Sequence, residues 1–216
     1  MKKIQPSDLT LMNDDYYRVE LAYARDDNLL FGERIYRRDA RLWLHQDLAH
    51  TVRNATRICL DDYGYRFILY DGLRTIEAQE AMMRTRRVKD NPHWLVAPRL
   101  LSPAGSGGHP RAMAIDIGLE TMDGELLDMG CAFDYLAENP HKDANPAHRE
   151  YAHSPDILSN RKILDDCMSR AADDWGLPLF PLPQEWWDFR MPPETFNQYT
   201  PISEDDLPDE MRLLDH

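Results

Sequence analysis

Apolar residues recur at helical spacing in two long segments of the chain, residues 39–64 and residues 156–176, with polar residues between the apolar positions. The first segment has Asp39 as its expected N-cap and Gly64 as its expected end, so it predicts a helix of about six turns. The second segment begins with a capping aspartate, Asp156, and ends at a glycine. Both stripes indicate helices that bury one face against a core.

Three strands and a shorter helix are predicted between these segments. Residues 65–70 are rich in β-prone side chains and stop at an Asp-Gly turn. Residues 75–87 predict a second helix, with a threonine as its cap and a glutamate in its first turn. Residues 112–120 alternate as a strand does, and the Asp-Gly turn after them predicts a return strand at residues 125–129. The mixture indicates one α+β domain.

The alternation in residues 112–120 divides the strand into two faces. One face consists of large apolar residues, namely Met113, Ile115, Ile117 and Leu119. The other face holds Asp116 among alanines and a glycine, which leaves room for a ligand beside the carboxylate. A buried carboxylate needs a positive partner, and His109 stands seven residues upstream in a Gly-rich loop. Together these two residues suggest a metal site.

The composition restricts the classes of function. With 216 residues, of which 43% are hydrophobic, the chain can form one globular domain with a sizeable core. The net charge of -13 argues against nucleic acids and anionic membranes as partners, and no stretch has the roughly 20 apolar residues that span a bilayer. Residues 200–216 are rich in Asp and Glu and predict a solvated polar tail.

The cysteines bear on the compartment. Cys59, Cys131 and Cys167 stand far apart among apolar residues, which is typical of reduced core thiols and not of a disulfide framework or a thiolate cluster. The N-terminus has two lysines but no apolar segment after them, so no secretory signal is predicted. We expect a cytoplasmic protein.

Two other groups of residues could do chemistry. Glu185 and Asp188 flank a pair of tryptophans, and Arg74 follows the Asp-Gly turn that begins at Asp71. Each group has a structural explanation when it is taken singly. A strand aspartate can satisfy backbone or arginine neighbours, the Glu-Trp-Trp-Asp segment can be the edge of an aromatic core, and Arg74 can be tied to Asp71.

Their order along the chain resembles the D-alanyl-D-alanine dipeptidase family, the vancomycin-resistance type of zinc dipeptidase. That family carries Asp-x-Tyr-Arg-Pro, then Ser-x-His-x-x-Gly-x-Ala-x-Asp, and finally Glu-x-Trp-His. The corresponding segments here are residues 71–75, 107–116 and 185–188, and the similarity extends over roughly residues 20–190. The resemblance implies a single domain of the hedgehog and D,D-carboxypeptidase kind, in which an antiparallel sheet flanked by helices holds the metal.

The resemblance also implies roles for individual residues. His109, Asp116 and Asp188 match the three metal ligands, and Glu185 matches the glutamate that serves as general acid and base. Arg74 matches the arginine that stabilises charge on the scissile carbonyl oxygen. The remaining matches and assignments concern substrate binding, with Asp134 at the position that receives the ammonium of the dipeptide and with Ser106 and Tyr23 in the substrate pocket.

The sequence departs from the family pattern at several positions. Asp188 stands where the third ligand is His, Gly107 where the family has a serine that helps hold the substrate, Ala112 where it has Gly, and Thr75 where it has Pro. Two aspartates and one histidine neutralise a dication, so the centre is expected to be a weaker Lewis acid and to shift its preference from zinc towards manganese or another harder ion.

The spacing of the last two site residues raises a geometric question. Residues 185 and 188 point to opposite faces of a regular strand. A metal near both therefore requires a bend in the chain or a site at the end of a strand.

The leading hypothesis is a metal-dependent enzyme that hydrolyses D-Ala-D-Ala or a related small cell-wall peptide, with no nucleic-acid or membrane partner. A second hypothesis is a non-catalytic descendant that binds a metal or a peptide. A third keeps the chemistry and changes the substrate to another D,D- or L,D-peptide of the wall. The sequence does not separate these, because pocket shape determines the substrate, and it leaves the oligomeric state open.

Overall fold

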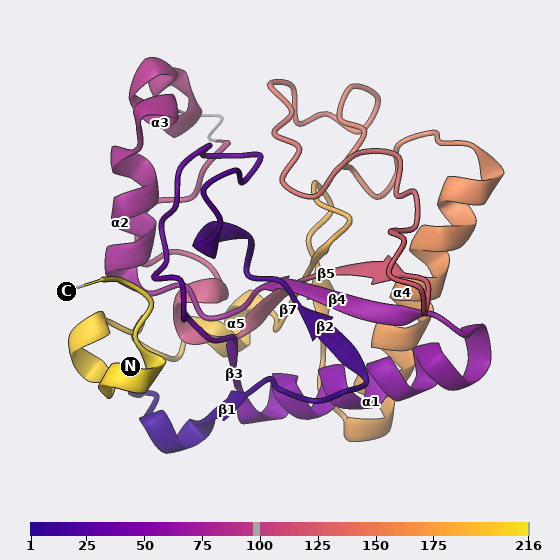
Figure 1. Cartoon of the computed structure of the whole chain (residues 1–216), viewed down its shortest axis with the longest axis horizontal. Helices are drawn as coiled ribbons and strands as arrows, with labels where there is room; N and C mark the ends of the chain where they lie inside the picture. The colour runs from indigo at the N-terminus through magenta and orange to yellow at the C-terminus, as the bar shows by residue number, and fades with distance from the viewer. Residues whose placement is uncertain (97–99, 216) are drawn as a thin grey trace.

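The computed structural model describes residues 1–96 and 100–215, and its centre is a five-stranded sheet with the strand order β2-β4-β5-β7-β6 (Figure 1). Its strands are β2 (Tyr17–Val19), β4 (Arg66–Asp71), β5 (Ala114–Glu120), β6 (Phe180–Pro181) and β7 (Asp188–Arg190). Neighbouring strands are antiparallel except β2 and β4, which are parallel. A separate pair joins β1 (Leu9–Leu11) to β3 (Trp43–His45).

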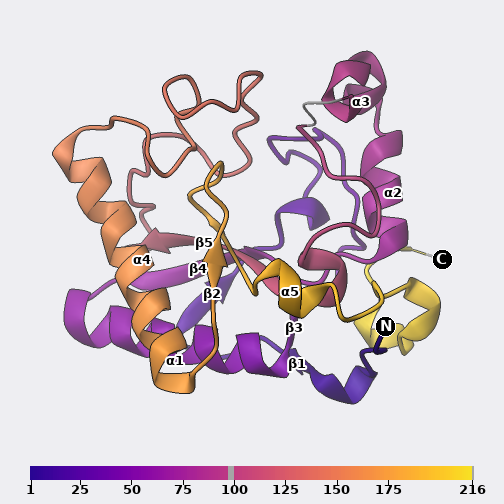
Figure 2. The same cartoon turned by 180° about the vertical axis from the view of Figure 1, so that it is seen from behind.

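The helices surround this sheet (Figures 1 and 2). They are α1 (Gln46–Tyr63), α2 (Ile76–Arg84), α3 (Arg86–Asp90), α4 (Pro155–Trp175) and α5 (Pro193–Phe196), with short 3-10 helices at Pro6–Asp8, Ala22–Ala24, Pro92–Leu95, His109–Arg111, Glu204–Asp206 and Asp209–Met211. Helices α1 and α4 pack against each other and against β4 and β5. The predicted α+β class, with a largely antiparallel sheet and flanking helices, is confirmed.

The two long helices end as predicted but begin elsewhere. Gly64 and Gly176 both have a φ of 70°, which a glycine adopts without steric cost at a helix end. The prediction of Asp39 as the first cap is wrong, because the residues before Gln46 form β3 and the side chain of His45 accepts the capping hydrogen bond. The prediction of Asp156 as the other cap is wrong by two residues, since Ser154 is the N-cap residue.

The predicted helix over residues 75–87 is divided in two. The hydroxyl of Thr75 accepts a hydrogen bond from the amide of Ala78 at 3.2 Å, as predicted, and begins α2. Thr85 then ends α2 and caps α3. The predicted return strand at residues 125–129 is reduced to a single bridge between Glu120 and Leu126.

Strand β5 is buried along its whole length, so neither of its faces is open to solvent over the full strand. Ile115 and Ile117 belong to the main hydrophobic core, as the alternation predicts. On the other face, a Cβ on Gly118 would lie 2.9 Å from the ring of Tyr70. The small residue therefore admits an aromatic side chain there, and Asp116 is the residue of β5 that lines the cavity of the candidate site.

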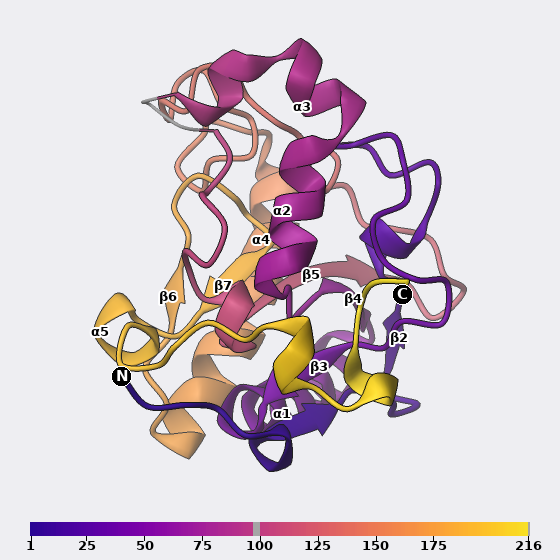
Figure 3. The same cartoon turned by 90° about the vertical axis from the view of Figure 1, so that its left-hand side faces the viewer.

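The C-terminal segment differs from the predicted solvated tail. Ile202, Leu207 and Leu213 are buried. Glu204 is also buried, where its carboxylate accepts hydrogen bonds from the Thr75 hydroxyl at 2.6 Å and from the Leu213 amide at 3.0 Å. The segment packs below α2, as Figure 3 shows. Its acidic composition concealed three buried apolar residues and one glutamate that accepts hydrogen bonds inside the protein.

Candidate metal centre and peptide site

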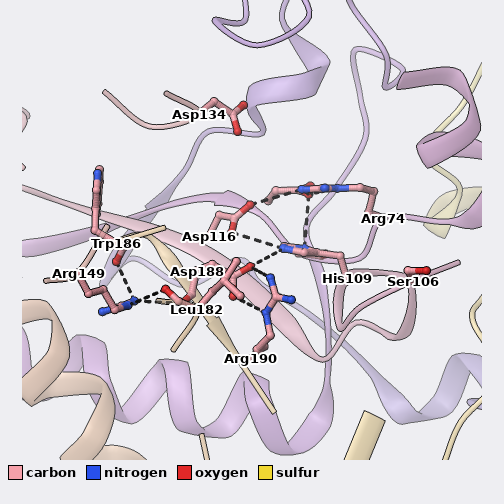
Figure 4. Close-up of polar contacts among 12 residues, drawn as sticks. Arg74, Ser106, His109, Asp116, Asp134, Arg149, Leu182, Trp186, Asp188 and Arg190 are labelled. Carbon is pink, nitrogen blue, oxygen red and sulfur yellow. Dashed lines mark hydrogen bonds and ion pairs between the residues drawn. The ribbon is translucent and has the colours of Figure 1, made fainter. Parts of the chain in front are cut away.

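His109 is the central residue of the site (Figure 4). It begins the 3-10 turn His109–Arg111 that leads into β5, and its imidazole is buried. Nδ1 lies 2.8 Å from the carbonyl oxygen of Gly72. Nε2 lies 3.4 Å from Oδ1 of Asp116 and 3.3 Å from Oδ2 of Asp188. When Nδ1 donates to the Gly72 carbonyl, Nε2 presents a lone pair to the two carboxylates, as metal-binding histidines do.

The charges around His109 attract a cation. Burial is the largest single influence and lowers the pKa of His109, but the Asp116 and Asp188 carboxylates together more than offset it and raise the pKa to about 10. Oδ1 of Asp116 is buried and has no hydrogen-bond partner among the described residues. The negative field that holds a proton on His109 equally favours a divalent cation, whose binding would release that proton.

The distance from His109 to each of the two carboxylates fits a metal ion. Ligands bound tetrahedrally at roughly 2.0–2.2 Å lie about 3.4 Å apart. The two distances from His109 Nε2 to Asp116 and Asp188, 3.4 and 3.3 Å, have this length. Oδ1 of Asp116 makes no hydrogen bond in the described structure, and its contact with Nε2 of His109 is an ion pair when His109 is protonated. This oxygen is therefore available to a metal ion.

Asp71 offers another candidate ligand, because one of its oxygens lies within 4.8 Å of ligand atoms of His109 and Asp116. Its oxygens are already engaged, however. Oδ1 accepts a hydrogen bond from the Tyr36 hydroxyl at 2.9 Å, and Oδ2 contacts Arg74 Nε at 2.8 Å. Asp71 also faces Nδ1 of His109, at 3.6 Å, and not Nε2. Asp71 therefore also orients Arg74 and His109. Asp188 is engaged in the same way, because Arg190 binds both of its oxygens, but it faces Nε2 of His109. Asp188 is not a member of the group Asp71, His109 and Asp116, whose ligand atoms all lie within 4.8 Å of one another.

Glu185 lies in the turn before β7, and Asp188 is the first residue of that strand. This arrangement answers the geometric question raised by the spacing, since the site stands at a strand end. Glu185 is half-buried and lines the same cavity as His109. Burial, followed by the Asp188 and Asp116 carboxylates, raises the pKa of Glu185 to about 7. A carboxylate with this pKa can both accept and return a proton near neutral pH.

Arg74 lines the same cavity. Its Nη2 contacts Asp71 Oδ2 at 2.7 Å and Asp116 Oδ2 at 3.5 Å, and its guanidinium lies over the ring of Tyr23 at 5.1 Å. Nη2 also donates to the Tyr23 hydroxyl at 3.5 Å. Asp71, Asp116 and Tyr23 therefore hold this cation at the cavity wall. A fixed cation at this place can stabilise charge on a substrate oxygen.

Asp134 reaches the cavity from the long loop between β5 and α4. Its backbone has a φ of 62°, and Oδ1 accepts a hydrogen bond from the Tyr23 hydroxyl at 3.1 Å. Oδ2 is buried without a hydrogen-bond partner in the described structure. Burial raises the pKa of Asp134 well above its usual range, with the Asp116 carboxylate adding to the effect. This carboxyl group is therefore suited to a cationic partner.

Two arginines fix the segments that carry these residues. Arg149 donates to the carbonyl oxygens of Leu182, Trp186 and Asp188 at 3.1, 2.9 and 3.1 Å, which holds the turn with Glu185 (Figure 4). Arg161 on α4 donates to backbone carbonyls of the loop that contains Asp134. The loop is thus tied to a helix of the core.

All of the residues assigned from the sequence line one cavity of about 950 Å³, and Ser106 and Tyr23 are among them. Apolar side chains form another part of its wall, namely Leu30, Phe31, Met82, Met83, Leu100, Leu101 and Leu136. The sequence did not single out Arg190, which holds Asp188, or Arg149. The only signal for Arg190 was its place two residues after Asp188, which puts both side chains on one face of a strand.

Comparisons with known proteins show the family to which this chain is similar. A family model described as D-ala-D-ala dipeptidase matches residues 2–204. The D-alanyl-D-alanine dipeptidase of Escherichia coli (strain K12) is 29% identical over 178 residues, which cover 81% of this chain and 78% of that protein. The enzyme of the same name from Enterococcus faecium is 28% identical over 166 residues, 71% of this chain and 75% of that protein.

One solved structure also aligns with this chain, a Serratia marcescens L-Ala D-Glu endopeptidase. It has 15% identity and a TM-score of 0.40, and the alignment covers 69% of this chain and 80% of that one. None of the helices in the described part of the chain is long and apolar enough to cross a membrane.

Proposed function

This chain belongs to the D-Ala-D-Ala dipeptidase family of peptidases, and from that premise we propose that it hydrolyses D-Ala-D-Ala or a related small cell-wall dipeptide with the help of a divalent metal. His109, Asp116 and Asp188 would hold the metal. The observation that supports this most directly is the convergence of two carboxylates on His109 Nε2, with one buried oxygen of Asp116 left without a hydrogen bond.

The protein residues divide the remaining work. A bound divalent ion would supply an electrophilic centre and a more acidic water in the open position. Glu185 accepts the proton of the attacking water and returns it to the leaving amine. Arg74 faces the carbonyl oxygen and stabilises its developing charge. Asp134 receives the substrate ammonium on Oδ2, where a cation would satisfy the unpaired acceptor.

The donor set supports a choice among a few divalent metals. One imidazole and two carboxylates suit zinc, and the larger share of oxygen ligands also admits manganese or another harder divalent ion. Cys59, Cys131 and Cys167 are free cysteines, as predicted. The cytoplasmic location and the absence of a nucleic-acid partner remain predictions from the sequence.

Two alternatives belong with this proposal. The apolar wall that includes Met82 and Leu101 is suited to a side chain larger than that of alanine, which favours testing other D,D- and L,D-dipeptides. A non-catalytic protein that binds metal or peptide is the second alternative, and Asp188 in place of His is its motivation.

The test combines metal analysis of the purified protein with a dipeptide panel, read by mass spectrometry after supplementation with Zn²⁺ or Mn²⁺. We expect release of D-alanine or another single amino acid in the presence of one of these ions. Glu185→Ala, with unchanged metal content, separates the alternatives because the enzyme loses turnover whereas a binding protein keeps its ligand. Protein that binds neither ion and cleaves no dipeptide would overturn the proposal.

A further inference from the structure

Asp188 is held by an arginine on the same strand. Nε of Arg190 donates to Oδ1 of Asp188 at 2.6 Å, and Nη2 donates to Oδ2, so the contact is bidentate (Figure 4). The Asp188 side chain is 1% exposed and that of Arg190 is 15% exposed. The two residues therefore form a largely buried ion pair at the wall of the cavity.

This pair changes the charge of the centre. A dication with Asp116 and Asp188 as ligands has a net charge of zero, and a fixed guanidinium in contact with Asp188 restores one positive charge. We propose that Asp188 and Arg190 act together as one electrically neutral ligand, with Arg190 as a positioning residue that sets both the charge of the metal centre and the direction of the Asp188 carboxylate. This inference rests on the proposed function, since it assumes a metal at His109.

The geometry permits both contacts of Asp188 at once. A carboxylate oxygen has two lone pairs, and Oδ2 of Asp188 accepts from Arg190 while it faces Nε2 of His109 at 3.3 Å. The planar fork of an arginine fixes the orientation of the carboxylate that it binds. Nη1 of Arg190 lies beside Gly107, where an added Cβ would be 3.7 Å away, and the guanidinium forms part of the cavity wall.

Metal affinity separates this role from a structural one. The experiment titrates metal-free full-length protein with Zn²⁺ by calorimetry, in competition with a chelator. Arg190→Gln removes the positive charge and keeps a hydrogen-bond donor, so we expect Zn²⁺ to bind about tenfold more tightly or better while turnover falls. Arg190→Lys keeps the charge and should bind Zn²⁺ within about threefold of the wild type. A purely structural Arg190 predicts weaker binding in Arg190→Gln.

Replacing Asp188 gives a second test. In Asp188→His the Arg190 guanidinium has no carboxylate partner and repels the metal, so we expect affinity to fall by about tenfold or more. The double variant Asp188→His, Arg190→Gln should recover affinity to within about threefold of the wild type, since the pair is then replaced by one neutral imidazole. Asp188→His that binds Zn²⁺ as tightly as the wild type would overturn the inference.

Controls distinguish a failure of the proposed function from a failure of the inference about Arg190. Arg170→Gln changes the net charge equally at an exposed position on α4 and should leave Zn²⁺ affinity unchanged. Wild-type protein without Zn²⁺ affinity would overturn the proposed function, whereas a wild type that binds Zn²⁺ and an Arg190→Gln variant that binds it more weakly would overturn this inference alone. Arg190→Gln with faster turnover would mean that Arg190 competes with the metal, which also overturns it.

Discussion

Asp116 and Asp188 lie directly opposite each other on the antiparallel strands β5 and β7, and each carboxylate faces Nε2 of His109. Side chains in such a pair lie on the same face of the sheet, where like charges destabilise each other. His109 and Arg190 offset part of this repulsion. The arrangement is expected to be more stable once a dication joins the two strands.

Metal binding should therefore stabilise the folded protein. At a free metal concentration of 100 times Kd, the gain is about 2.7 kcal/mol, which raises Tm by roughly 5–11 °C for a chain of this length. The measurement is a thermal melt after treatment with a chelator and again after addition of Zn²⁺ or Mn²⁺. Asp116→Asn should abolish the shift, and a shift that persists in this variant would place the metal elsewhere.

Glu185 should govern turnover and not metal binding. Glu185→Gln removes the proton acceptor and preserves the size of the side chain, so kcat should fall by about 10²- to 10⁴-fold. Zn²⁺ affinity, measured by the same chelator competition, should stay within about threefold of the wild type. A variant that retains half of the wild-type turnover would assign proton transfer to another group.

The two halves of the site differ in how far the sequence predicted them. His109 and Asp116 are seven residues apart, and a Gly-rich loop that leads into a strand brings them together locally. Asp188 joins them only because β7 pairs with β5. The role of its partner Arg190 at the site cannot be predicted until that pairing is known. Strand pairing over more than 70 residues depends on the whole core, and no local pattern encodes it.

The same limit explains Asp71 and Glu204. A bulge between Leu69 and Asp71 shifts the register of β4 and places Asp71 opposite Asp116, which hydrophobic alternation does not predict. Glu204 stands among acidic residues that are solvent-exposed in most sequences. Its burial depends on donors from Thr75 and Leu213, one of which is 129 residues distant along the chain.

Asp134 should act on substrates with a free amino group. Asp134→Asn removes the charge that meets the ammonium, and the loss of one charge-assisted hydrogen bond should raise KM for a free dipeptide by about 10- to 100-fold. An N-acetylated dipeptide has no ammonium, so we expect the wild type to hydrolyse it slowly. The Asp134→Asn change should alter that rate little. Equal effects on both substrates would mean that Asp134 supports the loop and does not bind the amine.

Acid should weaken the fold through Glu120. Burial acts to raise the pKa of this glutamate, but hydrogen bonds from Arg18 and Arg66 lower the pKa below its usual range. A lowered folded-state pKa means that the stabilisation is present above the ordinary value of about 4.5 and is lost as the pH falls through the folded-state value. Urea unfolding of Glu120→Gln should show a loss of roughly 1–3 kcal/mol at pH 7 and a shallower dependence on pH below 5. Parallel pH profiles for both proteins would exclude Glu120 as a source of the acid sensitivity.

The C-terminal segment should support the loop that carries Arg74. Glu204 accepts a hydrogen bond from Thr75, the residue next to Arg74 and the N-cap of α2, so its removal leaves the Leu213 amide and the Thr75 hydroxyl without their acceptor. Glu204→Ala should therefore lower the free energy of unfolding by about 2–3 kcal/mol and make residues after 200 more accessible to a protease. Glu210→Ala, at an exposed position of the same segment, should change the unfolding energy by less than about 0.5 kcal/mol. The removal of a buried acceptor with two donors should cost free energy of unfolding. If both variants nevertheless unfold at the same urea concentration as the wild type, the segment does not support the site.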